Sequence, residues 1–179
     1  MKNILLALTL LISFVSFSQK DEKQDIFNRK HEVKLGAVKL LTGGIFEATY
    51  EYVQDKNKGF GISLLVNFDK NNDYLENYSI TPFYRMYFQT YEDYGAKGFF
   101  VEGFTSFFIG DNTDFYIEGD NTIKDKDFFD ISIGIALGKK WINTSRFIFE
   151  FKVGVGRNLL GNSEYDILFK GDLSIGYRF

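Results

Sequence analysis

The segment ILFKGDLSIGYRF, residues 167–179, decides the fold class of this 179-residue chain. Side chains that follow one another along an extended strand point to opposite faces, so the segment divides into two sets. One set is apolar apart from one glycine: Ile167, Phe169, Gly171, Leu173, Ile175, Tyr177 and Phe179. The other set is mostly small or charged: Leu168, Lys170, Asp172, Ser174, Gly176 and Arg178. The segment therefore predicts an amphipathic strand that ends on the last residue.

The same alternation recurs upstream at hairpin intervals. Counting the last one, eight strands are predicted, at 33–41, 46–52, 60–69, 78–88, 99–109, 129–138, 147–156 and 167–179. The first segment alternates weakly. Pro82, the only proline, lies inside the fourth and counts against full pairing there, because proline has no N–H to donate to the ladder. Aromatic residues make up 18% of the chain, which also favours a mostly β structure.

Residues 1–18 have the composition of a secretory signal peptide. Lys2 precedes an apolar run over residues 4–17, and the small residues Ser16 and Ser18 suit a cleavage site after Ser18. The run is short for a membrane-spanning helix, which needs roughly 20 residues. We therefore expect a cleaved signal peptide at 1–18, a polar spacer at 19–30 and one β-barrel domain at 31–179.

The composition of the polar face of the predicted strands distinguishes a membrane barrel from a soluble one. A soluble barrel turns this face to water and fills it with long charged side chains, whereas here it is rich in glycine, serine and alanine with single charges between them. That composition suits the narrow interior that eight strands enclose. The longer segments also match the roughly 9–11 residues of a membrane strand. The prediction is an all-β, eight-stranded antiparallel up-and-down transmembrane β-barrel, with a soluble exported barrel or sandwich as the alternative.

Three stretches add a family resemblance: ITPFYRMYF at 80–88, GFFVEGF at 98–104 and LSIGYRF at 173–179. Together with the signal peptide they make the chain resemble the OmpA/OmpX-type small barrels, and more closely an uncharacterised family of bacterial outer-membrane barrels. The resemblance implies a Gram-negative outer membrane, contact with its lipid, and both termini in the periplasm. The loops at 42–44, 69–77, 110–127 and 157–166 would then be extracellular.

The resemblance also implies roles for particular aromatic and apolar residues. The C-terminal assembly signal, which the barrel-assembly machinery would read during biogenesis, consists of Leu173, Ile175, Tyr177 and Phe179. Candidates for the aromatic girdles at the two membrane interfaces are Tyr50, Tyr52, Tyr78, Trp141 and Tyr177.

Charged residues on the polar face are the candidate site. The alternation directs nine of them into the lumen: Glu47, Glu51, Arg85, Glu102, Glu150, Lys152, Lys170, Asp172 and Arg178. Arg85 and Glu102 form the best single pair, because they lie near the middle of adjacent antiparallel strands. Buried charges are tolerated when they are paired, so we expect a network that plugs the lumen; an ion path or a gated salt bridge is the alternative.

Several functions find no support in the sequence. A net charge of −3, or −4 once Lys2 leaves with the signal peptide, gives no hint of a nucleic-acid surface. The chain has no cysteine, and its one histidine, His31, lies at the periplasmic start of the first strand, where a solvated residue is expected rather than a catalytic base. The run from Asp69 opens like a calcium loop but has Tyr74 where glycine is required and Ile80 where glutamate is required. The acidic residues of the 110–127 loop are expected to be solvated, and loose cation binding is the alternative.

The sequence thus predicts a non-enzymatic barrel with a structural or interaction role, without metal or cofactor and with an unidentified extracellular partner. Two alternatives stay open. One is a barrel that transports small solutes or hydrophobic molecules, and the other is a soluble periplasmic lipid-binding barrel.

Overall fold

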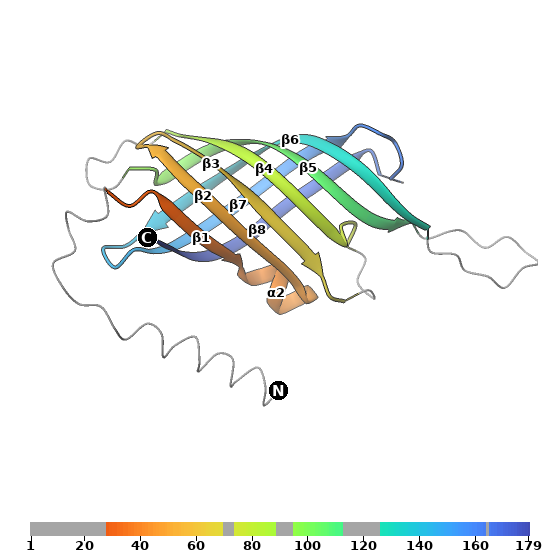
Figure 1. The fold of residues 1–179 in the computed structure, drawn as a ribbon, viewed down its shortest axis with the longest axis horizontal. Helices are drawn as coiled ribbons and strands as arrows, with labels where there is room; N and C mark the ends of the chain where they lie inside the picture. The colour runs from red at the N-terminus through yellow and green to blue at the C-terminus, as the bar shows by residue number, and fades with distance from the viewer. Residues whose placement is uncertain (1–27, 70–73, 89–94, 113–125, 164) are drawn as a thin grey trace, which may run out of the picture.

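The protein forms a closed barrel of eight antiparallel strands in sequential order (Figure 1). The computed structural model describes residues 28–69, 74–88, 95–112, 126–163 and 165–179. The strands are β1 His31–Gly36, β2 Ile45–Asp55, β3 Lys58–Asn67, β4 Tyr78–Tyr87, β5 Gly98–Asn112, β6 Lys126–Ile142, β7 Phe147–Asn158 and β8 Ile167–Arg178. This confirms the predicted fold class. The predicted signal peptide and most of the predicted spacer lie outside the described residues.

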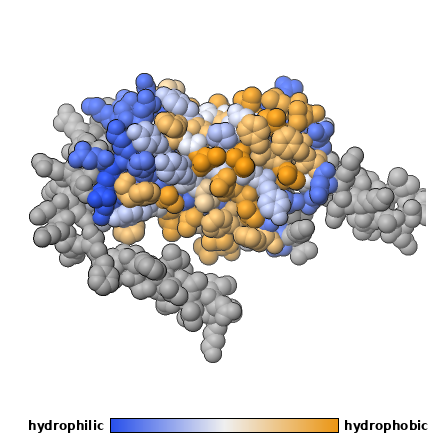
Figure 2. All heavy atoms as spheres, viewed as in Figure 1, coloured by the Kyte–Doolittle hydropathy of each residue, from blue (hydrophilic) through white to orange (hydrophobic). Residues whose placement is uncertain are grey.

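The two faces of the wall have the polarity that the alternation predicts. Outward side chains are apolar and exposed, for example Ile135 at 62% and Phe169 at 74%. Inward side chains include fully buried charges, for example Glu51 and Arg85, both at 0%. Figure 2 shows hydrophobic residues gathered over the middle of the visible face, with hydrophilic residues at the end where β1 starts and β8 ends. We call this the terminal end, and the opposite end, where α2 lies, the helix end.

The prediction of a strand over 33–41 is wrong in its second half. Strand β1 ends at Gly36, and the chain continues as the helix α2, Ala37–Gly43, so the predicted turn at 42–44 is reduced to its last residue. Gly44 closes the helix in the left-handed conformation, with φ at 63°, which glycine adopts without a steric penalty. The run AVKLL at 37–41 consists mostly of alanine, lysine and leucine, which are good helix formers, and this explains both the weak alternation and the helix.

Strand β1 is consequently much shorter than its neighbours. It pairs with β8 from Glu32↔Arg178 to Gly36↔Ser174 and with β2 from His31↔Tyr52 to Leu35↔Ala48. The first part of β8, residues 167–173, therefore has no strand partner on this side among the described residues. The helix α2 lies there instead, against both β2 and β8. No helix in the described part of the chain is long and apolar enough to cross a membrane.

Two further differences concern loops and the proline. The predicted loop at 139–146 is shorter than expected, because β6 continues to Ile142 and leaves a turn at 143–146. At the helix end, β5 and β6 run on to Asn112 and Lys126, and residues 113–125 lie outside the described residues.

Pro82 faces outward, and the β4–β5 ladder is interrupted only at Thr81 and Pro82. There the hydroxyls of Thr81 and Ser106, 2.9 Å apart, join the two strands instead.

Candidate functional site: the charged interior

The interior contains two clusters of ion pairs separated by aromatic side chains. The aromatic layer consists of Phe83 and Phe104 packed with Ala136. On its terminal side lies the larger cluster, which we call the terminal cluster: Glu32, Lys34, Glu51, Arg85, Glu102, Lys140, Glu150, Lys152 and Arg178. On its other side, below α2, lies the helix-end cluster: Lys39, Glu47, Glu76, Lys170 and Asp172.

Arg85 is the centre of the terminal cluster. It lies directly opposite Glu102 in the β4–β5 register, and its Nε donates to Glu102 Oε2 at 2.5 Å. Its Nη1 and Nη2 donate to the two carboxylate oxygens of Glu150 at 2.7 and 2.8 Å, and Nη1 also reaches Glu51 at 2.9 Å. The guanidinium lies over the rings of Phe83 and Phe100, at 4.6 and 4.2 Å from their centroids. Five donors on a planar group explain why arginine suits this position.

The other cations share the same carboxylates. Lys34 Nζ lies 2.7 Å from both Glu51 and Glu150. Lys140 Nζ lies 2.7 Å from Glu32 and 3.0 Å from Glu51. Glu51 also accepts from the hydroxyl of Tyr87 at 2.5 Å. Each of these carboxylates thus accepts from at least two donors, which is the condition under which buried charge is tolerated.

The terminal end is closed by a backbone segment as well as by charges. Arg178 pairs with Glu32 at 2.6 Å, and its guanidinium also donates to the carbonyl oxygens of Gly95 and Ala96 at 3.1 and 3.3 Å. Ala96 is fully buried and packs with Val53, Tyr87 and Phe100. Gly95 and Ala96, just before β5, therefore lie across the opening of the barrel at this end.

The helix-end cluster is built by residues that lie outside the strands as well as inside them. Lys39 of α2 points inward and pairs with Glu47 at 2.5 Å. Burial alone would lower the pKa of Lys39, but the attraction of Glu47, helped by Tyr74 and Glu76, outweighs it and raises that pKa above its usual value. Burial beside Glu76 raises the pKa of the Tyr74 hydroxyl.

Glu76, from the segment before β4, is fully buried and lies inside the barrel. It accepts from Lys170 at 2.7 Å, Ser106 at 3.2 Å and Tyr74 at 3.3 Å. Asp172 lies nearby, and neither of its carboxylate oxygens has a hydrogen-bond partner within normal geometry; only the backbone N–H groups of Leu173 and Lys39 approach it. Its cross-strand neighbour Lys152 turns instead to Glu102, at 3.2 Å.

All nine charges that the alternation directed inward are buried in the interior. Sequence reasoning missed Glu32, Lys34, Lys39, Glu76, Asp130 and Lys140, which are equally buried. Continuing the alternation of β6 beyond Gly138 finds Lys140, and reading 31–36 as a strand by itself finds Glu32 and Lys34. Lys39 and Glu76 come from a helix and a loop, so no strand period points to them. Asp130 does not join a cluster, because its carboxylate accepts the backbone N–H groups of residues 131, 160, 162 and 163.

The remaining predicted residues lie on the outside. Ile175 and Phe179 of the predicted assembly signal are 55% and 48% exposed, and Leu173 and Tyr177 are half-buried on the same face. All five girdle candidates also face outward. His31 is exposed, with its Nδ1 2.6 Å from the hydroxyl of Tyr50 and its ring stacked on Phe179. No group of three or more metal-ligating side chains is found among the described residues.

The comparisons with known proteins bear on the fold. No model of a protein family matches the chain, and no curated protein matches it. Among solved structures, the chain is similar to the crystal structure of the N-terminal beta-barrel domain of Pseudomonas aeruginosa OprF. The TM-score is 0.52 at 12% sequence identity, over 84% of this chain and 98% of that one. This likeness confirms the small eight-stranded barrel that the OmpA-type resemblance implies; membership of the uncharacterised family stays a prediction.

Proposed function

We propose that this chain is an integral outer-membrane protein of a Gram-negative bacterium, with a structural or interaction role and no enzymatic activity. The observation that carries the proposal is the polarity of the wall. Ion pairs fill the interior, whereas the outward face presents phenylalanine, isoleucine and valine. In water this arrangement would expose a continuous apolar belt, which soluble monomers rarely do.

The dimensions of the wall support the same proposal. Strand β7 carries outward Phe147, Phe149, Phe151, Val153 and Val155 in succession. From Phe147 to Arg157 is ten residue steps, about 33 Å along the strand at roughly 3.3 Å per residue. At a tilt of about 35–45° this spans about 25 Å, the height of the apolar band of outer-membrane barrels. Closure of the barrel also gives the backbone N–H and C=O groups of most of the wall hydrogen-bond partners, which lipid cannot supply.

The interior supports a barrel closed to solutes. Arg85, Arg178 and Lys140 are at most 1% exposed, and each contacts at least one carboxylate from another strand. Opening a path through the terminal cluster would separate several of these pairs at once. We therefore infer a structural plug rather than a channel. In this proposal the chain is exported by a cleaved signal peptide at 1–18 and assembled with the C-terminal residues as the recognition signal.

Membrane fractionation with a heat-modifiability gel tests the proposal. We expect the protein to be recovered only with detergent and to migrate differently before and after boiling, since intact small barrels resist unfolding in the gel buffer. Recovery as a monodisperse protein in plain buffer would instead support the soluble lipid-binding barrel. Planar-bilayer recording tests the plug: we expect no sizeable steady current, and a stable conductance would support the transport barrel.

A further inference from the structure

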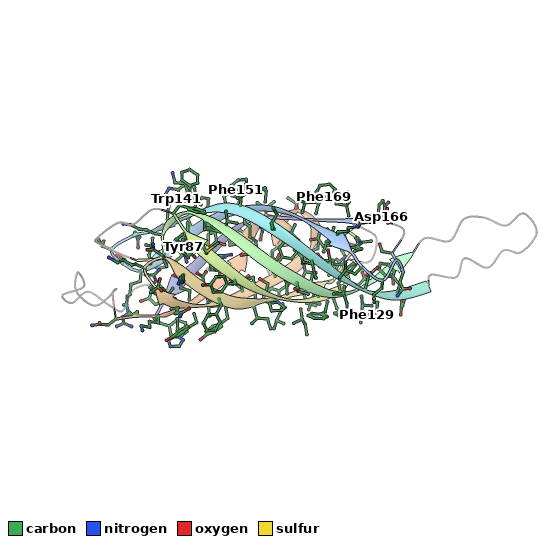
Figure 3. All side chains as sticks on the ribbon, turned by 90° about the horizontal axis from the view of Figure 1, so that it is seen from above. Tyr87, Phe129, Trp141, Phe151, Asp166 and Phe169 are labelled. Atoms are coloured by element: carbon green, nitrogen blue, oxygen red, sulfur yellow. The ribbon has the colours of Figure 1, made fainter. Side chains whose placement is uncertain are left out.

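The outward wall carries a lysine among aromatic side chains near the terminal end. Lys139 lies on β6 directly opposite Phe99 of β5 and Phe151 of β7, and Trp141 is the next outward residue of β6 toward the terminal end. All three rings are exposed. Figure 3 shows Trp141 and Phe151 pointing away from the barrel on the same side of the molecule. Lys139 is therefore a cation on the surface that the proposed function turns toward lipid.

The ammonium of Lys139 contacts aromatic rings and no carboxylate. Its Nζ lies 4.6 Å from the centroid of the Phe99 ring and 5.1 Å from that of Trp141, so two rings fix its position by cation–π contact. An ammonium also has three N–H donors, for which oxygen atoms are the usual acceptors. Within the described part of the chain Lys139 has no hydrogen bond or ion pair. Its donors are therefore available to an acceptor from outside the protein.

The wall around Lys139 has no negative charge to neutralise it. The outward carboxylates of β5 and β6 are Asp111 and Asp127, which lie opposite each other at the helix end, and β7 has none. Near the terminal end, the outward positions of these three strands are thus apolar with one positive charge. A ligand that complements this surface needs a negative charge and an apolar part.

The depth of Lys139 suits the phosphate level of the membrane. Trp141 is two residue steps nearer the terminal end, about 5 Å in height at a tilt of about 35–45°, and aromatic residues mark the interfaces of outer-membrane barrels. Because Nζ lies over the Trp141 ring, the four-carbon stem of Lys139 runs toward that interface, as lysine stems do when they bring their charge to the polar edge of a membrane. In the topology that the OmpA-type resemblance implies, this end is periplasmic. The acceptors at this level are then phosphates of the periplasmic leaflet.

We propose that Lys139, Phe99 and Trp141 form a binding site for an anionic glycerophospholipid of the periplasmic leaflet. The Lys139 ammonium donates charge-assisted hydrogen bonds to the phosphate. One acyl chain lies over Leu137 and Val153, the next outward pair toward the middle of the wall. A head group with a net negative charge is preferred, because this part of the wall offers no carboxylate to the ammonium of a zwitterionic one. The proposal rests on the membrane location proposed above.

Native mass spectrometry of the detergent-extracted, delipidated protein tests this inference with three lipids of equal acyl chains: phosphatidylglycerol, phosphatidylethanolamine and phosphatidylcholine. We expect one retained phosphatidylglycerol, bound at least tenfold more tightly than either zwitterionic lipid. Lys139→Gln should weaken this binding at least tenfold. Lys139→Arg should keep it within about threefold, because the charge remains and a guanidinium also stacks on aromatic rings. Glycerol 3-phosphate, which has the phosphate without the acyl chains, should not displace the lipid.

Arg157→Gln is the matched control, because Arg157 is the outward cation of β7 at the helix end, opposite Ile133 and Ile167. Its binding of phosphatidylglycerol should equal that of the wild type. The inference is overturned if Lys139→Gln binds like the wild type, if Arg157→Gln weakens binding as much as Lys139→Gln does, if phosphatidylethanolamine binds as tightly as phosphatidylglycerol, or if glycerol 3-phosphate displaces the lipid. A protein recovered without detergent would refute the membrane location itself, whereas a detergent-dependent barrel with any of these results would refute the lipid site alone.

Discussion

Replacing Arg85 with methionine tests whether the terminal cluster holds the barrel together. The change removes a fully buried cation that three carboxylates share, Glu51, Glu102 and Glu150. Removing one partner of a buried ion pair costs about 3–5 kcal/mol, because it leaves uncompensated charge. Each carboxylate keeps another cation nearby, so we expect a loss near the lower end, about 3 kcal/mol.

The assay is urea unfolding of the barrel in lipid vesicles, with the folded fraction read from the unboiled gel. Lys58→Met is the control, since Lys58 is exposed at the start of β3, and it should change the free energy of unfolding by less than about 0.5 kcal/mol. The double variant R85M/E150Q should recover part of the loss, because Glu51 and Glu102 then still have lysine partners. An R85M variant as stable as the control would show that water, rather than packed ion pairs, solvates the interior charges.

Three further outcomes are expected. A spin label at Leu41→Cys, introduced into this cysteine-free chain, should become more mobile when Lys39→Met removes the contact with Glu47. In the chain that keeps Lys39, the mobility of the label should not change between pH 7 and 9.5. The pKa of Lys39 is raised above its ordinary 10.5, and the stabilisation is lost only as the pH rises through the pKa of the folded state. A more mobile label at pH 9.5 would contradict this. Backbone hydrogen exchange in β8 should be faster at residues 168–173 than at 174–178, where β1 pairs with the strand. Equal protection of the two parts would mean that α2 shields the backbone N–H groups of 168–173 as well as a strand does. Gly61→Val should prevent the heat-modifiable band from forming, because a Cβ there would lie 2.0 Å from the Tyr50 carbonyl oxygen, and a normal band would show that β2 and β3 can separate.

The alternation of apolar and polar residues predicts most of the barrel, because one face of each strand is turned outward and the other is turned toward the interior. It directs Arg85 and Glu102 inward near the middle of adjacent strands, and the register then brings the two side chains into contact. It fails where a segment leaves the strand conformation. Residues 37–41 keep an apolar composition but belong to a helix, and Glu76 enters the lumen from a loop. The contacts of such residues depend on the three-dimensional path of the chain, which periodicity does not contain.

The brevity of β1 has a consequence for how the cylinder is completed. The circle closes only when the first strand meets the last, and that junction consists of register pairs that all fall within residues 174–178 of β8. Deletion of residues 174–179 would thus remove every pair between β1 and β8, together with the four β7–β8 pairs from Glu150↔Ser174 to Phe147↔Tyr177, while the pairing from β1 through β7 stayed intact. Such a truncated chain would be an open curved sheet with two bare edges, prone to join with a neighbour of the same kind.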